Sequence, residues 1–383
     1  MMNQLKLYTW ATVCCSLFFV SSCDKDDDIV GTEDDDTTTV VVSDTISSDT
    51  MFENSPSIEK VYIVNEGGFG IGNGSVSYYD VMADTVYNNI YQTANGVPLG
   101  DVVQSVFVHG DTTYICVNNS NKVEVVKTST FESIAQIEVA NPRYAVAIND
   151  YCYVTSQKYG AYQVKVIDIN TLSVVDSIDV GASCEQLAVS NGKLYVANGA
   201  WGADSTVTVI DLSSNTVNKT IDVGFYGPSA LKVDSTGTVW VLAAGKTIYD
   251  ASWAVVGHEP SALIKIDQNT DEVVSTIALF DEKHPSKMEE KGNGIYISEG
   301  TAIYKLALDA TAMPSSPIIA EDNYGFTINK ESGVIFVLKS NSSANGTLVR
   351  YSAQGNKLNE FEVGVFPNGG TSGKRQLFST LKF

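Results

Sequence analysis

Seven short hydrophobic segments recur along the chain, each with one aromatic residue at the same place. They read KVYIVNEG, TTYICVNN, YCYVTSQ, KLYVANG, TVWVLAAG, GIYISEG and VIFVLKS. The shared aromatic residues are Tyr62, Tyr114, Tyr153, Tyr195, Trp240, Tyr296 and Phe336. Each segment is rich in β-branched residues, which is typical of a buried strand. Their average spacing of about 46 residues predicts the four-stranded blades of a β-propeller.

Further strands are predicted on both sides of each aromatic segment. An inner strand precedes it, as in QSVFVHGD, RYAVAIND, EQLAVSNG and SALKVDSTG, and two more strands follow, as in QVKVID and VVDSIDV. Asp168, Asp211 and Asp267 end such strands before polar turns, and we expect their side chains to bond the turn backbone. No segment has a long helical period. We therefore predict an all-β chain with four strands in each blade.

The first blade lacks an inner strand of its own. The pattern begins directly with KVYIVNEG, whereas the C-terminus restarts it with VFPNGG after FEVG. We predict that residues 366–383 supply the missing strand and close the ring, which removes free sheet edges. The expected domain is a seven-bladed β-propeller over residues 58–383, with six or eight blades as the alternatives.

The N-terminus carries the pattern of an export signal. Lys6 precedes an apolar run over residues 7–20, which is shorter than the span of about 20 apolar residues that a transmembrane helix needs. The sequence Val20-Ser21-Ser22-Cys23 then resembles a bacterial lipobox. That resemblance implies that residues 1–22 are a lipoprotein signal peptide and that Cys23 is the lipidated residue. The alternative is an ordinary secreted protein with an acidic start.

The segment after Cys23 is strongly acidic. Residues 24–50 hold ten carboxylates against one lysine, a composition that predicts a disordered tether over residues 23–57. The run CDKDDD resembles the signal that sends Bacteroidota lipoproteins to the outer face of the outer membrane. The whole chain has a net charge of −21, which disfavours nucleic acid as a partner and leaves the lipid anchor as the expected membrane contact.

Candidate ligand-binding residues lie in the loops of one face of the predicted propeller. These loops join the second strand to the third, or one blade to the next, and loops on a rigid scaffold commonly carry function. Their large polar and aromatic residues are Phe69, Asn118, Arg143, Tyr159, Trp201, Tyr226, Tyr249, Trp253 and His258. The longest loop, GKTIYDASWAVVGHEP in blade 5, supplies the last three. The alternative for Trp253 is packing against its own blade.

The sequence predicts no catalytic residues. It contains no HExxH, GxSxG or Walker-type motif, and GGFGIGNG lies between two strands with no helix after it. The three histidines, His109, His258 and His284, fall in different blades and at different strand positions. We therefore expect a protein that is not an enzyme and has no bound metal.

Two alternatives about metals and cysteines stay open at this point. A set of amide and carboxylate side chains at the predicted channel mouth could hold Ca²⁺, as in propeller lactonases, or could be solvated strand ends; these residues are Glu66, Asn118, Asn198 and Glu299. The cysteines that follow the signal and Cys23 form neither a zinc pattern nor a disulfide framework. A bridge between Cys116 and Cys152 is left undecided.

The strand sequences LYVAN, VTVID and TVNKTIDVG resemble the YncE-type seven-bladed propellers over residues 58–383. Together with the lipobox and acidic run, the chain is similar to surface lipoproteins of gut Bacteroidota, and among them to the BtuG-type cobalamin-capturing proteins. The resemblance implies a surface lipoprotein of the outer membrane that captures cobalamin or a related corrinoid as transported ligand, without a cofactor, and passes it to a TonB-dependent transporter. The alternatives are a glycan- or peptide-binding lipoprotein and a metal-dependent hydrolase or lactonase.

Overall fold

The computed structural model describes residues 59–374, all within the compact unit Asn54–Phe383. The predictions for the signal peptide (1–22), Cys23 and the tether (23–57) lie outside the described residues, as do positions 375–383. No helix in the described part of the chain is long and apolar enough to cross a membrane.

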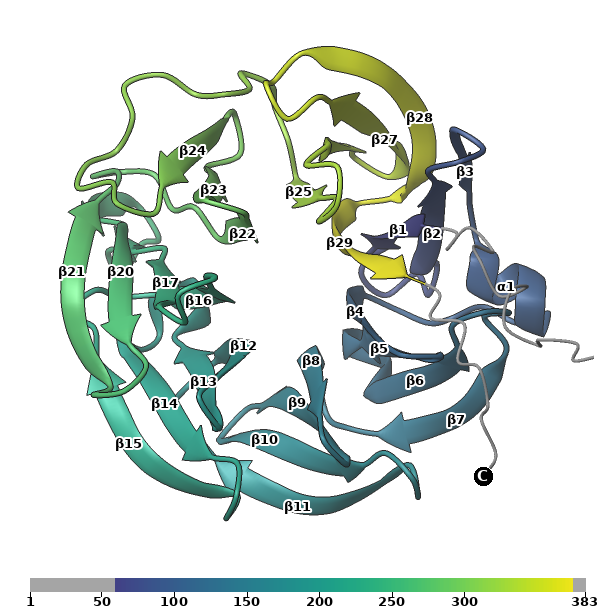
Figure 1. Cartoon of the computed structure of the whole chain (residues 1–383), viewed down its shortest axis with the longest axis horizontal. Helices are drawn as coiled ribbons and strands as arrows, with labels where there is room; N and C mark the ends of the chain where they lie inside the picture. The colour runs from purple at the N-terminus through teal and green to yellow at the C-terminus, as the bar shows by residue number, and fades with distance from the viewer. Residues whose placement is uncertain (1–58, 375–383) are drawn as a thin grey trace, which may run out of the picture. The chain divides into compact units, whose positions relative to one another are not determined.

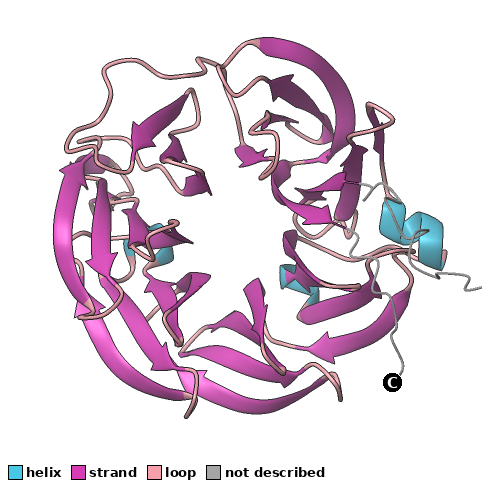
Figure 2. Ribbon diagram, viewed as in Figure 1, coloured by secondary structure: helices cyan, strands magenta, loops and turns pink. Residues whose placement is uncertain are grey.

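Seven antiparallel sheets follow one another around a ring in the described unit (Figures 1 and 2), which confirms the predicted seven-bladed propeller. In each blade the strands are given from the channel outwards. Blade 1 contains β29 (Pro367–Lys374), β1 (Glu59–Asn65), β2 (Ser75–Asp80) and β3 (Thr85–Tyr87), and blade 2 contains β4 (Val103–His109), β5 (Thr112–Val117), β6 (Lys122–Lys127) and β7 (Ser133–Glu138). Blade 3 contains β8 (Pro142–Ile148), β9 (Tyr151–Lys158), β10 (Ala161–Asp168) and β11 (Ser173–Asp179), and blade 4 contains β12 (Cys184–Ser190), β13 (Lys193–Asn198), β14 (Thr206–Asp211) and β15 (Thr216–Asp222).

The remaining blades follow the same order with one exception. Blade 5 contains β16 (Pro228–Val233), β17 (Val239–Ala243), β20 (Ala262–Asp267) and β21 (Glu272–Ala278). Blade 6 has only three strands, β22 (Lys287–Lys291), β23 (Gly294–Ser298) and β24 (Ile303–Ala307). Blade 7 contains β25 (Gly325–Ile328), β26 (Ile335–Asn341), β27 (Ala344–Tyr351) and β28 (Lys357–Val365). The short helices are α1 (Ile90–Asn95), η1 (Asn118–Ser120) and η2 (Ala200–Gly202).

The C-terminal strand closes the ring as predicted. Strand β29 pairs antiparallel with β1, with Tyr62 opposite Thr371, and so becomes the inner strand of blade 1. Gly370 permits the close approach, because a Cβ there would lie 2.1 Å from the carbonyl oxygen of Tyr62. The closure leaves the inner side of β1 paired instead of open to another chain.

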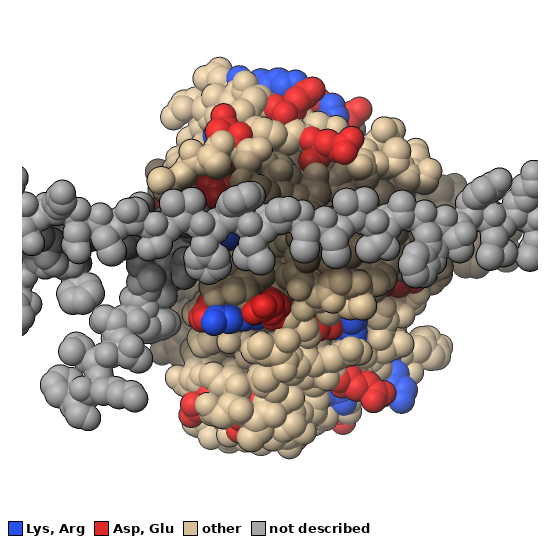
Figure 3. Space-filling model, turned by 90° about the vertical axis from the view of Figure 1, so that its right-hand side faces the viewer, with Lys and Arg blue, Asp and Glu red and all other residues tan. Residues whose placement is uncertain are grey.

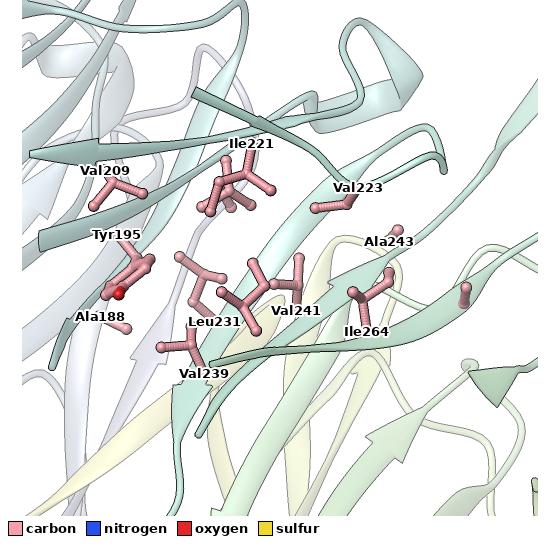
Figure 4. Close-up of a cluster of buried hydrophobic side chains, with 14 residues drawn as sticks. Ala188, Tyr195, Val209, Ile221, Val223, Leu231, Val239, Val241, Ala243 and Ile264 are labelled. Atoms are coloured by element: carbon pink, nitrogen blue, oxygen red, sulfur yellow. The ribbon is translucent and has the colours of Figure 1, made fainter. Parts of the chain in front are cut away.

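The core consists of seven hydrophobic clusters, each of which joins two neighbouring blades. All seven repeated aromatic residues lie in these clusters and are 2% exposed or less. Figure 4 shows the cluster between blades 4 and 5, where Tyr195 and Ile221 meet Leu231 and Val241. The hydroxyl of Tyr195 also donates to Asp271 Oδ1 at 2.6 Å, which ties blade 4 to blade 5. The pattern of aromatic residues therefore marks the surfaces where blades pack.

The predicted aspartate turns are confirmed. Asp168 accepts the backbone N–H of Asn170 at 2.8 Å, and Asp211 and Asp267 accept the N–H two residues later in the same way. The backbone N–H groups of Thr171 and Asn170 lower the pKa of Asp168, and those of Thr270 and Asn269 lower the pKa of Asp267. Each turn thus begins with a carboxylate that stabilises the reversal between the third and fourth strands.

The structure differs from the prediction at the outer strand of blade 6. The prediction of four strands in every blade is wrong there, because this sheet has three strands and only an isolated bridge joins Ile303 to Ile319. Pro314 and Pro317 lie in the intervening segment, and proline has no N–H to give to a strand ladder. In blade 1 the outer strand β3 has only three residues, and helix α1 follows it.

The insertion in blade 5 falls where the sequence placed it and is itself folded. Strands β18 (Lys246–Tyr249) and β19 (Val255–Glu259) pair as a separate hairpin between β17 and β20.

Cys116, Cys152 and Cys184 are free and buried, so no disulfide bridge joins Cys116 to Cys152. On the uncovered part of the side shown in Figure 3, basic side chains lie beside acidic ones.

Candidate functional site

One position from each blade lies at the same end of the central channel. The inner strands run in the same direction, so the residues at or beside their starts converge there. We call this set the mouth ring: Asn368, Gln104, Arg143, Glu185, Ser229, Lys287 and Tyr324, in the order of blades 1 to 7. Together with loop residues they line a pocket of about 540 Å³. A second cavity of about 380 Å³ continues along the channel and shares Gln104, Tyr144, Lys287 and Asn368 with it.

Arg143 and Glu185 form an ion pair on one side of the mouth ring. The Nε of Arg143 lies 3.0 Å and its Nη2 lies 2.6 Å from Glu185 Oε1, and its Nη1 donates to Gln104 Oε1 at 2.6 Å. Gln157 donates to the same carboxylate oxygen at 3.0 Å. Burial alone would lower the pKa of Arg143, but the charge and hydrogen bond of Glu185, together with Tyr144 and Glu66, outweigh it, so the pKa is raised. The guanidinium is therefore charged, and Glu185 balances its charge.

Trp201 stands at the rim above this pair. Its ring lies 5.5 Å from the guanidinium carbon of Arg143, and its side chain is 78% exposed. Its backbone is left-handed, with φ 58°, which is uncommon for a bulky residue. The adjacent Gly202 packs against β18, since a Cβ there would lie 2.3 Å from the Cβ of Lys246. The loop of blade 4 and the hairpin of blade 5 are thus in direct contact.

The β18–β19 hairpin adds more aromatic surface to the rim. Tyr249 lines the pocket, and the Trp253 ring lies 6.1 Å from it at the hairpin tip. Trp253 is 82% exposed and left-handed, with φ 65°. Asp250 Oδ1 accepts N–H groups of the tip residues Ser252 and Ala254 at 2.8 and 3.0 Å, which holds this turn. The exposure of Trp253 gives no support to the alternative that it packs onto its blade.

Two histidines meet behind the hairpin, although the sequence placed them apart. His258 Nδ1 lies 2.9 Å from His284 Nε2, and His284 Nδ1 lies 2.8 Å from the carbonyl oxygen of Ala244. Because a carbonyl only accepts, His284 carries its proton on Nδ1 and its Nε2 accepts from His258 when both rings are neutral. The pair joins β19 to the connection between blades 5 and 6, a contact that strand positions alone could not predict.

The opposite side of the mouth ring holds a phenol and an amine. The hydroxyl of Tyr324 donates to Glu66 Oε2 at 2.7 Å, and burial together with that carboxylate raises the pKa of Tyr324. Lys287 donates to the side-chain oxygen of Asn368 across the ring. Burial lowers the pKa of Lys287; the charges of Glu66 and Glu185 oppose this, and the charge of Arg143 adds to it. The pocket therefore combines aromatic walls with amide, carboxylate and basic groups.

The nine predicted ligand-binding residues fall into three groups. Arg143, Trp201 and Tyr249 line the pocket. A second group contacts lining residues: Tyr226 lies under the amine of Lys246 at 3.3 Å, Trp253 lies beside Tyr249, and His258 bonds His284.

The third group lies on the same loops but does not line the pocket. Phe69 and Tyr159 are 80% and 94% exposed, on the second-to-third strand loops of blades 1 and 3. Asn118 donates to the carbonyl oxygen of Pro142 at 3.1 Å and so supports the residue before Arg143. Apart from Arg143, the residues of the mouth ring were not predicted as candidates, above all Gln104, Lys287 and Asn368. The start of each inner strand was the signal that could have found them.

The residues considered for a Ca²⁺ site are held by separate partners. Glu66 accepts from Tyr324, Asn198 donates to Thr206 and Thr208, and Glu299 pairs with Lys283 at 3.0 Å. Within residues 59–374, no three side chains of His, Cys, Asp or Glu lie close enough together to hold a metal ion. This arrangement lends no support to the lactonase alternative.

These features define a seven-bladed β-propeller with a polar, aromatic-rimmed pocket at one end of its channel. The chain belongs to the DUF5074 family, a domain of unknown function, whose sequence profile matches residues 59–367. No curated protein matches the chain.

Two solved structures are similar in fold. Hydrazine synthase from Kuenenia stuttgartiensis is 16% identical, covers 69% of this chain and 86% of its own, and superposes with a TM-score of 0.56. Apo AztD from Citrobacter koseri is 11% identical, covers 83% and 99%, and superposes with a TM-score of 0.52. At these identities the likeness concerns the fold alone.

Proposed function

We propose that this protein is a cell-surface lipoprotein that captures cobalamin or a related corrinoid in the mouth of its propeller. In this role it binds the ligand without chemical change and passes it to a TonB-dependent transporter of the outer membrane. The proposal combines the resemblance in the strand repeats and leader sequence with the character of the pocket.

The observation that carries the proposal is the concentration of exposed aromatic rings around a polar pocket. Trp201, Tyr249 and Trp253 lie next to one another on the rim and are exposed. Trp201 and Trp253 have a left-handed backbone conformation. Val102, Phe131, Leu172 and Phe366 are also left-handed, so the support comes from the exposure of the two tryptophans and not from their backbone.

The chemistry of the pocket suits a broad, flat ligand with a polar edge. Aromatic side chains give rigid apolar contact at low cost in conformational entropy, and their polar atoms stay available at the rim. A corrinoid carries a flat ring system bordered by amide groups, which match the amide, hydroxyl and charged side chains of the mouth ring. The tether predicted for residues 23–57 would keep the propeller next to a membrane transporter and raise its effective concentration there.

Calorimetric titration of the purified protein with cyanocobalamin tests the proposal. We expect saturable binding of one ligand per protein, together with a shift in the visible absorbance of the corrinoid. Absence of heat and of any absorbance change at micromolar protein would overturn it.

The glycan-binding alternative uses the same exposed tryptophans and is separated by the same sample. Retardation of the protein in polysaccharide-containing gels, with no effect of cyanocobalamin, would favour a glycan ligand. A metal-dependent hydrolase would instead turn over lactone or ester substrates and lose that activity with a chelator.

A further inference from the structure

The charges of the pocket are opposite in balance to those of the whole protein. The chain has a net charge of −21. The pocket, however, is lined by three basic side chains, Arg143, Lys246 and Lys287, against the two carboxylates Glu66 and Glu185. A local excess of positive charge on an acidic protein attracts anionic groups specifically to that place.

Two of the three basic groups are already occupied by protein partners. Each of the three side-chain nitrogens of Arg143 donates one hydrogen bond to Glu185 or Gln104, and Glu185 balances its charge. The amine of Lys246 lies 3.3 Å above the ring of Tyr226, outside the mouth ring. The charge of Arg143 is therefore balanced by Glu185, and the amine of Lys246 is held against an aromatic ring.

Neither Lys246 nor Lys287 has a carboxylate of residues 59–374 within ion-pair distance of its amine. Lys287 differs from Lys246 because it belongs to the mouth ring and lines both the pocket and the channel cavity. Its hydrogen bond goes to a neutral acceptor, the side-chain oxygen of Asn368. That bond leaves two N–H groups of the ammonium for a ligand. The side-chain nitrogen of Asn368 also has no acceptor in the described part of the chain, and both residues line the pocket and the channel behind it.

The carboxylates in the pocket are directed elsewhere. Glu185 is paired with Arg143 at 2.6 Å, and Glu66 accepts the hydroxyl of Tyr324 at 2.7 Å. Burial lowers the pKa of Lys287, although the charges of Glu66 and Glu185 act in the opposite direction without forming an ion pair with it. An anion between the pocket and the channel cavity would supply a negative charge next to Lys287 and accept hydrogen bonds from Lys287 and Asn368.

We propose that Lys287 and Asn368 form an anion-binding point that recognises the phosphate ester of the captured ligand. The inference rests on the proposed function, since the phosphate is that of the nucleotide arm of cobalamin. The ammonium group of Lys287 and the amide group of Asn368 donate hydrogen bonds to the phosphate oxygens at the inner end of the pocket, while the aromatic residues of the rim contact the corrin ring system. Lys287 is therefore a specificity-determining residue, which distinguishes phosphate-bearing corrinoids from those without phosphate.

The test compares cyanocobalamin with dicyanocobinamide, a corrinoid that lacks the phosphate and nucleotide. We expect the wild-type protein to bind cyanocobalamin more tightly. A hydrogen bond to a charged group corresponds to a change in affinity of about 10- to 100-fold, so Lys287→Met should weaken cyanocobalamin binding by that factor. The same variant should leave cobinamide binding unchanged within about twofold, and Lys287→Arg should retain the preference.

Lys232→Met is the matched control. Lys232 lines the channel cavity but not the pocket, and it pairs with Glu289 at 3.3 Å. This variant should keep the preference for cyanocobalamin. Equal weakening of both corrinoids by Lys287→Met, or weakening of neither, would overturn the anion-binding point while leaving corrinoid capture intact.

If neither corrinoid binds the wild-type protein, the proposed function fails and the anion-binding point is tested with inorganic phosphate alone. In protein with ¹³C-labelled lysine, the Lys287 side-chain resonance, assigned by its loss in Lys287→Met, should shift with phosphate but not with chloride at equal ionic strength. A resonance that responds equally to both salts would overturn the proposal.

Discussion

Trp253→Asn separates the binding role of the hairpin tip from a structural one. Trp253 is 82% exposed and left-handed, with φ 65°. Asparagine adopts this conformation far more readily, so the change should recover most of the about 1–2 kcal/mol that the backbone costs a bulky residue. The ring pair with Tyr249, at 6.1 Å, is lost. An exposed pair of this kind contributes about 0.5 kcal/mol. The free energy of unfolding should therefore stay unchanged or rise by up to about 1 kcal/mol.

Binding should respond in the opposite direction. An aromatic rim residue that contacts ligand contributes about 1–2 kcal/mol, so Trp253→Asn should weaken cyanocobalamin binding by roughly 5- to 30-fold. The two quantities are measured on one preparation, by urea denaturation followed by circular dichroism and by calorimetric titration. Trp201→Asn is a second test of the same kind, because Trp201 is also exposed and left-handed.

A buried tryptophan provides the control. Trp240 is fully buried and donates to Asp234 at 2.8 Å, so Trp240→Phe should lower stability without changing the affinity of the folded protein. The reasoning would be refuted if Trp253→Asn lost more than about 1 kcal/mol of stability while cyanocobalamin affinity stayed the same, since the ring would then act in packing.

Three further predictions concern the scaffold. Tyr153 is buried between blades 3 and 4, and Tyr153→Ala should cost about 3–5 kcal/mol in urea denaturation without changing the affinity of the folded fraction. Burial would raise the pKa of Asp234, but hydrogen bonds from Thr236 and Trp240 lower the pKa overall. The ionised Asp234 carboxylate therefore stabilises the folded protein above the pKa of the unfolded state, and this stabilisation is lost as the pH falls through the lower pKa of the folded state. Stability of the wild type should therefore decline more steeply than that of Asp234→Asn below about pH 4, and parallel pH curves would contradict this. Deletion of residues 366–383 removes β29 and leaves β1 unpaired on its inner side, so size-exclusion chromatography should show aggregation in place of a monomer-sized folded species.

The architecture could be predicted from the sequence because it rests on local, repeated signals. Each blade repeats one aromatic residue in a strand rich in β-branched residues. The lack of an inner-strand pattern before Lys60, together with VFPNGG at the C-terminus, predicted how the ring closes. The long insertion in blade 5 was visible as a spacing. The missing outer strand of blade 6 was not, although Pro314 and Pro317 argued against a strand there.

The site was less predictable because its members meet only across the channel. Arg143, Trp201 and Tyr249 were selected as large residues of loops on the correct face. Lys287 and Asn368 were not selected: Lys287 begins a five-residue strand with no motif, and Asn368 was considered only as part of the closing strand VFPNGG. Their importance comes from position: the start of each inner strand faces the same point, and only the closed ring brings Lys287 to Asn368. In a propeller, reading the first residue of every inner strand as one set would have identified this ring.

A crystal structure of the protein with bound cyanocobalamin, phased to show the anomalous signal of cobalt, tests the central claim most directly. The account predicts one strong cobalt peak over the channel mouth, beside Trp201 and Tyr249, with the phosphate arm directed toward Lys287. A cobalt peak away from the mouth ring, or no ordered cobalt in crystals saturated with ligand, would contradict it.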